Sequence, residues 1–183
     1  MSDPRDFAVT EALRNGVTAT IRALRADDRE RMAIAVRNLD RASIYTRLFS
    51  YRTELTEAGL DRIMRFDPDA EVALVVTTGA GPDAAIVGAG RYVVSGTQDE
   101  DARRTAEVAF MVEEDFHGLG IAGRVLRHLA TIARARGIVS FEAEILPENK
   151  AMQAVFARSG LPMRTRRGDG VVHITLALHD GPP

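Results

Sequence analysis

The sequence predicts an α/β (α+β) fold, with a mixed central sheet of about six to seven strands flanked by about four to five helices. Three observations lead to this prediction. Segments rich in β-branched residues alternate with segments in which apolar residues recur at helical spacing. These segments follow the order β, helices, β-β-β, α, β, α, β-β, which is typical of mixed sheets. The chain of 183 residues, 45% of them hydrophobic and 27% charged, can also bury a sizeable core.

The N-terminal part of the chain predicts one strand followed by helices. Residues 1–16 are polar and lack a hydrophobic signal core, so we expect a flexible N-terminal lead-in to a domain spanning residues 17–178. Residues 17–24 are rich in β-branched side chains and predict the first strand. Asp27 or Asp28 is expected to cap the first helix. The helices predicted in this part cover residues 27–40, 42–51 and 55–66.

The rest of the chain predicts the remainder of the sheet and two more helices. The strands are expected in residues 70–78, 84–94, 105–112, 138–146, 161–167 and 171–178. Turn residues join the first two and the last two of these strands, as in β-hairpins. A long helix is expected to end near residue 136, and a second helix, in residues 148–160, is closed by Gly160.

The composition excludes several classes of protein. A net charge of -2 and a pI of about 6.1 offer no electrostatic grip on nucleic acid or anionic lipid, so neither is an expected partner. No apolar run approaches the roughly 20 residues that span a bilayer. The chain has no cysteine, which excludes disulfides and thiolate chemistry and favours the cytoplasm. His128, His173 and His179 are scattered without ligand spacing, so no metal site is expected.

The segment DFHGLGIAGRVL, residues 115–126, has three glycines around the start of a helical apolar pattern. Glycine destabilises a helix, so the pattern indicates that something approaches the backbone closely. Small residues at four of the six positions 118–123 would let a phosphate reach the first N–H groups of the helix, at the positive end of its dipole. The alternative is a turn that only packs closely. A P-loop is excluded because no Gly-Lys-Ser/Thr occurs here. A dinucleotide-binding fingerprint is also disfavoured, because it would lie near a first strand and this segment lies about two-thirds of the way along the chain.

Residues 108–138 resemble the acetyl-CoA-binding core of the GNAT N-acetyltransferase superfamily, whose signature is Gln or Arg, two residues, Gly, one residue, and Gly or Ala. Residues 140–161 resemble the next strand of that fold and its helix with an asparagine. The resemblance extends over roughly residues 17–177 and implies a GNAT fold with acetyl-CoA as co-substrate. The coenzyme-binding residues that it implies are Met111, Val112, His117, Gly118, Leu119, Gly120, Ile121, Ala122, Gly123, Arg124, Asn149 and Met152.

His117 departs from the signature, because the family has Gln or Arg at this position. One interpretation is tolerance, since backbone amides hold the phosphates. The other is that a protonated His117 adds a charge-assisted contact to phosphate. The second interpretation predicts that affinity for coenzyme A weakens as the pH rises through the histidine range.

Glu107 is the candidate general base. The resemblance implies direct attack of an amine on the thioester, and an amine with a reference pKa of about 10.4 must first lose a proton. Alternation along the strand places Glu107 beside Ala109 and Met111, and a carboxylate among such residues in a mostly buried strand is unusual. Burial there would raise its pKa toward that of a useful base. The alternatives are a solvent-facing glutamate and an ion pair with Arg103 or Arg104.

The resemblance also assigns residues around the thioester. The N–H of Val112 is expected to stabilise the oxyanion, and Met111 to Glu113 to present main chain to the pantetheine arm. Asn149 is either the asparagine of the family that contacts pantetheine or an ordinary helix cap. Phe156 stands where many members have a tyrosine that protonates the leaving thiolate, so no general acid is assigned.

The acceptor side resembles the acetyltransferase domain of bacterial Pat-type protein lysine acetyltransferases, on residues 43–67, 106–126 and 146–152. This implies a lysine of a protein as acceptor, with AMP-forming acyl-CoA synthetases as the substrate class. Pat proteins carry an added regulatory or synthetase-like domain, for which we expect no room in 183 residues. Two alternatives stay open: acetylation of a small-molecule amine, and a non-catalytic acetyl-CoA-binding regulatory module. Oligomeric state, acyl-chain preference and regulation are not indicated by the sequence.

Overall fold

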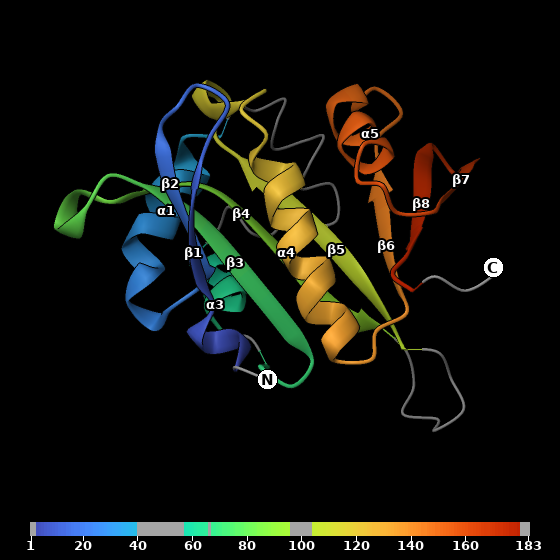
Figure 1. Ribbon diagram of the computed structural model, residues 1–183, viewed down its shortest axis with the longest axis horizontal. Coiled ribbons are helices and arrows are strands. Elements are labelled where there is room, and N and C mark those ends of the chain that lie inside the picture. The colour runs from blue at the N-terminus through green and yellow to red at the C-terminus, as the bar shows by residue number, and fades with distance from the viewer. Residues whose placement is uncertain (1–2, 40–56, 66, 96–103, 180–183) are drawn as a thin grey trace.

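A computed structural model of the chain describes residues 3–39, 57–65, 67–95 and 104–179 (Figure 1). Its centre is an eight-stranded sheet in the order β1-β2-β3-β4-β5-β6-β8-β7. All neighbouring strands are antiparallel except β5 and β6, which are parallel. The strands are β1 Ala8–Ala12, β2 Thr18–Ala23, β3 Glu71–Thr78, β4 Ala85–Ser95, β5 Thr105–Val112, β6 Ser140–Ile145, β7 Met163–Gly168 and β8 Val171–Ala177. The α-helices are α1 Arg29–Arg37, α3 Glu57–Met64, α4 Ile121–Ala135 and α5 Lys150–Ala157.

The mixed α/β fold and the seven strands predicted after residue 16 are confirmed. The eighth strand, β1, lies in the segment that we predicted as a flexible lead-in, and that prediction is wrong for residues 8–12. The segment reads Ala-Val-Thr-Glu-Ala, and it pairs antiparallel with β2 from Ala8–Arg22 to Ala12–Thr18. Five residues at the sheet edge, with no side chain fully buried, give too weak an alternation to stand out among polar neighbours.

The helices cover two faces of the sheet (Figure 1). Helix α4 packs against β4 and β3 and shares a buried cluster with Val108, Phe110 and Val112 of β5. Helices α1 and α3 share a second buried cluster with Met111. The predicted alternation along β5 is therefore confirmed, and the two clusters lie on opposite faces. The predicted helix in residues 42–51 lies outside the described residues. Among the described residues, no helix is long and apolar enough to cross a membrane.

Two glycines of β4 let α4 lie close to the sheet. A Cβ atom at Gly88 would lie 2.7 Å from the Ile121 side chain, and one at Gly90 would lie 2.6 Å from that of Val125. Both distances are shorter than van der Waals contact allows. The glycines of β4 thus set the height of α4, and with it the position of the glycine segment at its start.

The sheet forks between β5 and β6 (Figure 1). The two strands pair only from Thr105–Ser140 to Glu107–Glu142, after which β6 continues along β8. The N–H of Glu113 donates to the carbonyl of Val87 at 3.0 Å, so Val112 and Gly88 form a non-hydrogen-bonded pair. The N–H and C=O of Val112 therefore face away from β4, toward the fork.

Asp28 is fully buried at the start of α1, where we expected Asp27 or Asp28 to cap the helix. Its carboxylate does not cap α1 but accepts two hydrogen bonds from the Arg22 guanidinium, at 2.6 and 2.7 Å, and one from the N–H of Arg25 at 2.9 Å. Burial opposes ionisation of Asp28, but these hydrogen bonds outweigh it and lower its pKa.

Candidate active site

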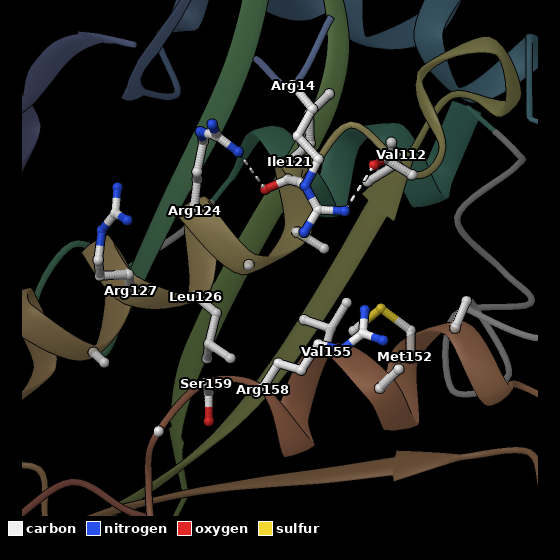
Figure 2. A pocket seen from close by; sticks show the side chains of 18 of the residues that line it. Arg14, Val112, Ile121, Arg124, Leu126, Arg127, Met152, Val155, Arg158 and Ser159 are labelled. Carbon is white, nitrogen blue, oxygen red and sulfur yellow. Dashed lines mark hydrogen bonds between the residues drawn. The ribbon is translucent and has the colours of Figure 1, made fainter. Parts of the chain in front are cut away.

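A groove of about 710 Å³ runs between α4 and α5 (Figure 2). One wall is the glycine segment with the first turns of α4, and the other is the α5 face that carries Met152 and Val155. The third contribution comes from Arg14, in the turn between β1 and β2. The groove is therefore built from three segments that are far apart in the sequence.

The glycine segment leaves its main chain accessible. Gly118 and Gly120 have φ angles of 75° and 84°, a left-handed conformation that side chains with a Cβ atom rarely adopt. Gly123 is helical, and a Cβ atom there would meet no atom within 4 Å. The first hydrogen bond of α4 runs from the N–H of Arg124 to the carbonyl of Gly120, at 3.2 Å. The N–H groups before Arg124 thus have no intrahelical partner and lie where an anion is favoured.

His117 is held against the end of β5. Its Nε2 lies 3.0 Å from the carbonyl oxygen of Val112, which requires that Nε2 carries the proton and donates. The side chain thereby links the glycine segment to the strand end that faces the fork. This contact is a third role for His117, beside the tolerance and the phosphate contact that the sequence suggested.

The arginines of the groove differ in what they contact. Arg124 pairs with Glu11 of β1 at 3.1 Å and donates to the carbonyls of Ala12, Leu119 and Gly120. Figure 2 shows its side chain pointing away from α5, whereas Arg14 reaches over the start of α4. Arg124 thus clamps β1 to α4 while it also lines the groove, and its coenzyme contact stays a prediction.

Sequence reasoning missed Arg14 and Arg158, which both line the groove. Arg14 lay in the predicted lead-in, where the alternation of β1 was the only signal that could have brought it into the domain. Arg158 follows the last turn of α5 and has no motif of its own. Both are exposed cations beside the groove.

Glu107 lies where β5 and β6 separate, and its side chain is exposed. The expectation that Glu107 is enclosed by apolar side chains is therefore wrong. Helices α1 and α3 cover this face of β5 at Met111, but they leave the side chain of Glu107 exposed. A small cavity of about 30 Å³ lies in the fork, lined by Glu107, Phe110, Asn149 and Phe156 among others. Of the ion-pair partners considered, Arg104 donates to the carbonyl of Arg136, and Arg103 lies outside the described residues.

Helix α5 supplies the other side of the fork. Asn149 caps this helix, since its Oδ1 accepts the N–H of Met152 at 3.1 Å, and it is 6% exposed. The helix-cap interpretation is thus confirmed, and the same residue lines the fork cavity. Phe156 is buried against Phe110, with ring centroids 6.1 Å apart.

The predicted coenzyme residues do not all meet. His117, Gly118, Gly120, Ile121, Ala122, Gly123, Arg124, Val112 and Met152 line the groove. Met111, Leu119 and Asn149 do not line it. The Met111 side chain is buried with α1 and α3, and its main chain belongs to the hydrogen-bonded pair with Ala89 of β4. Leu119 packs against the main core cluster, and Asn149 lines the fork cavity.

These features fit coenzyme A. Accessible amides at a helix start suit a diphosphate, and the groove leads from them past Val112 to Met152, which also lines the fork cavity. A groove with accessible amides beside a forked sheet fits a transferase that uses an acyl-coenzyme A. Residues 19–162 match the acetyltransferase (GNAT) domain family, and the chain belongs to this family. It is an N-acetyltransferase with acetyl-CoA as co-substrate.

Three relatives sharpen this assignment. The chain is 29% identical over 143 residues to the acetyltransferase PA5475 of Pseudomonas aeruginosa, covering 78% of this chain and 74% of that protein. It is 30% identical over 149 residues to the acetyltransferase Pat of Mycolicibacterium smegmatis, covering 81% of this chain but only 42% of Pat. The crystal structure of the GNAT domain of S. lividans PAT superposes with a TM-score of 0.81 at 32% identity, covering 93% of this chain and 96% of that domain.

Proposed function

We propose that the protein transfers an acetyl group from acetyl-CoA to the ε-amine of a lysine on another protein, with Glu107 as general base. The observation that carries this proposal is the position of Glu107, an exposed carboxylate at the point where β5 and β6 separate. An AMP-forming acyl-CoA synthetase is the acceptor class that we favour.

The acceptor proposal is supported by the likeness to PAT. The match to the S. lividans PAT domain covers 93% of the chain, so it extends beyond the coenzyme-binding core that acetyltransferases of many specificities share. An exposed carboxylate is also accessible to a side chain presented by a folded partner.

The base proposal follows from the geometry of β5. Side chains alternate, so Glu107 projects from the face opposite α4, while the main chain of Val112 faces the fork. An acceptor lysine could thus approach from one side while the thioester lies along the open edge of the strand. Glu107 would accept the proton of the ammonium group, and the neutral amine would attack the thioester carbonyl.

The remaining steps need few side chains. The N–H of Val112 would donate to the oxyanion that forms on the thioester carbonyl. Collapse of the tetrahedral intermediate would break the C–S bond, release coenzyme A as the thiolate and pass the second proton of the attacking nitrogen to water. Phe156 has no proton to give, so we propose that the thiolate leaves unaided or takes a proton from water.

The test uses radiolabelled acetyl-CoA, a purified AMP-forming acyl-CoA synthetase and, in parallel, a panel of small amines. Glu107→Gln is compared with Glu142→Gln, which removes another exposed carboxylate at the register partner of Glu107 in β6. We expect Glu107→Gln to lower turnover by about 10²-fold or more and to leave acetyl-CoA affinity unchanged. Glu142→Gln should stay close to the wild type.

Each part of the proposal can fail separately. Equal turnover of the wild type and Glu107→Gln would remove Glu107 from the mechanism. Efficient acetylation of a small amine, with no labelled lysine on any protein, would replace the protein acceptor by a small one. Binding of acetyl-CoA without transfer to any acceptor would indicate a non-catalytic module.

A further inference from the structure

We propose that Arg14 binds the diphosphate of coenzyme A, which makes β1 and the turn after it a part of the coenzyme site. Arg14 precedes the residues that match the acetyltransferase family, which begin at residue 19. The proposal concerns the donor side of the reaction and does not depend on the nature of the acceptor.

The guanidinium group of Arg14 lies against the glycine segment. Its Nη1 donates to the carbonyl of Gly118 at 3.1 Å, and the Arg14 N–H donates to the carbonyl of Leu119 at 3.3 Å. The side chain therefore lies directly over the segment whose N–H groups begin α4 (Figure 2). A phosphate seated on those amides would lie within reach of the same guanidinium group.

The described contacts leave Arg14 with hydrogen-bonding capacity for a ligand. A guanidinium group has five N–H donors, and the described contacts of Arg14 use one of them. Among the residues that the structure describes, no carboxylate pairs with Arg14. A planar cation with remaining donors suits the oxygens of a diphosphate, which can accept two parallel hydrogen bonds.

The arginines near Arg14 are engaged in other contacts. Glu11 accepts hydrogen bonds from Arg127 and pairs with Arg124, so one carboxylate occupies both cations. Arg134 donates to the carbonyl of Leu178. Arg158, the fifth arginine of the groove, lies across it at the end of α5. Among the described contacts, Arg14 is therefore the arginine that lies over the glycine segment without a carboxylate partner.

Strand β1, which precedes Arg14, is fixed in place. Glu11 is held by Arg124, Arg127 and, at 2.6 Å, by Nε2 of His128, all three of them in α4. Leu13 is 3% exposed and anchors the turn in the core. Since Glu11 is bound to α4 and Leu13 is buried in the core, the segment that leads into Arg14 is held in place before the coenzyme binds.

The experiment measures binding of coenzyme A and of 3′-dephospho-coenzyme A by calorimetry, for the wild type, Arg14→Gln and Arg167→Gln. Arg167 is an exposed arginine of edge strand β7 outside the groove, so its variant loses the same charge elsewhere. We expect Arg14→Gln to weaken both ligands by about tenfold, because the diphosphate is common to them. Arg167→Gln should bind both as the wild type does.

Two results would overturn the proposal: unchanged binding by Arg14→Gln, or a loss for coenzyme A alone, which would assign Arg14 to the 3′-phosphate. If Arg14→Gln does not fold, arginine-selective modification of the wild type with phenylglyoxal decides the question. Dephospho-coenzyme A should protect Arg14 and leave Arg167 reactive, and equal reactivity of Arg14 with and without this ligand would refute the assignment. Wild-type binding of coenzyme A is the baseline of both experiments, so a failure of the donor assignment itself would be seen separately.

Discussion

At the start of α4 the groove is lined by main-chain amides and small residues, whereas the small cavity in the fork between β5 and β6 is lined by side chains that include Glu107, Asn149 and Phe156. The first region depends on the absence of side chains, so its function is recorded in a local run of glycines. The second depends on side chains from separate elements that only the fold brings together. The two regions should therefore respond differently to substitution. The coenzyme end, at the start of α4, should be sensitive to added side-chain bulk, and the acceptor end, at the fork, should be sensitive to the loss of functional groups.

The largest effect is expected from Asp28→Ala, which removes the buried carboxylate at the start of α1, on the face of the sheet opposite α4. Removing this buried carboxylate leaves Arg22, whose side chain is 11% exposed, without its bidentate partner. We expect a loss of about 3 kcal/mol in the free energy of unfolding, measured with urea. Because the pKa of Asp28 is lowered on folding, the wild type should gain this stabilisation above the usual aspartate range and lose it as the pH falls. A variant as stable as the wild type would show that the pair does not hold α1.

The next effect is expected from Gly123→Leu, which breaks the coenzyme end by filling it. The site has open space around the position of a Cβ atom, and the residue is helical, so the protein should gain roughly 0.5–1 kcal/mol of stability. Affinity for coenzyme A should fall by about tenfold or more, because the new side chain projects into the groove. Ala157→Leu, at an exposed position of α5 outside the groove, is the control. Unchanged coenzyme affinity in Gly123→Leu would separate the groove from the coenzyme.

A smaller effect is expected from His117, which joins the two regions. His117→Ala removes the hydrogen-bond donor to the carbonyl of Val112, which should lower the free energy of unfolding by about 1 kcal/mol. We expect kcat to fall several-fold while the Kd of coenzyme A changes little, since the amides that hold the diphosphate remain. His117→Gln can still donate and should keep most of kcat. A fall in coenzyme affinity with unchanged kcat would favour the phosphate contact considered from the sequence.

The smallest effect is expected from Glu11→Gln, which loosens β1 from α4. Burial opposes ionisation of Glu11, but hydrogen bonds from His128 and Arg127 lower its pKa in the folded protein. The stabilisation is therefore present above the usual glutamate range and is lost as the pH falls. Partial exposure limits it to about 1 kcal/mol or less. Thermal unfolding between pH 3 and 7 should give a flatter stability profile for Glu11→Gln than for the wild type, and parallel profiles would contradict the clamp.

The same comparison explains how far the sequence could predict the site. The glycine segment could be read because its chemistry is local: three glycines at a helix start indicate an accessible main chain, and the left-handed angles of Gly118 and Gly120 confirm why glycine is needed. The apolar face of α4 could also be predicted from its helical spacing, and the burial of Ile121, Val125 and Leu129 confirms it.

What the sequence missed depends on distant segments. Glu107 was expected to be buried, but exposure is set by how far β6 follows β5, and strand separation leaves no mark in either strand. Arg14 was assigned to a lead-in, because β1 has only five residues and is fixed by the remote residues Arg124, Arg127 and His128. Side chains that act across elements need the fold before they can be recognised.

The most direct measurement is a crystal structure of the protein with coenzyme A. We expect diphosphate oxygens within about 2.7–3.2 Å of the backbone nitrogens that begin α4, in residues 118–123. A coenzyme bound elsewhere, with these nitrogens untouched, would contradict it.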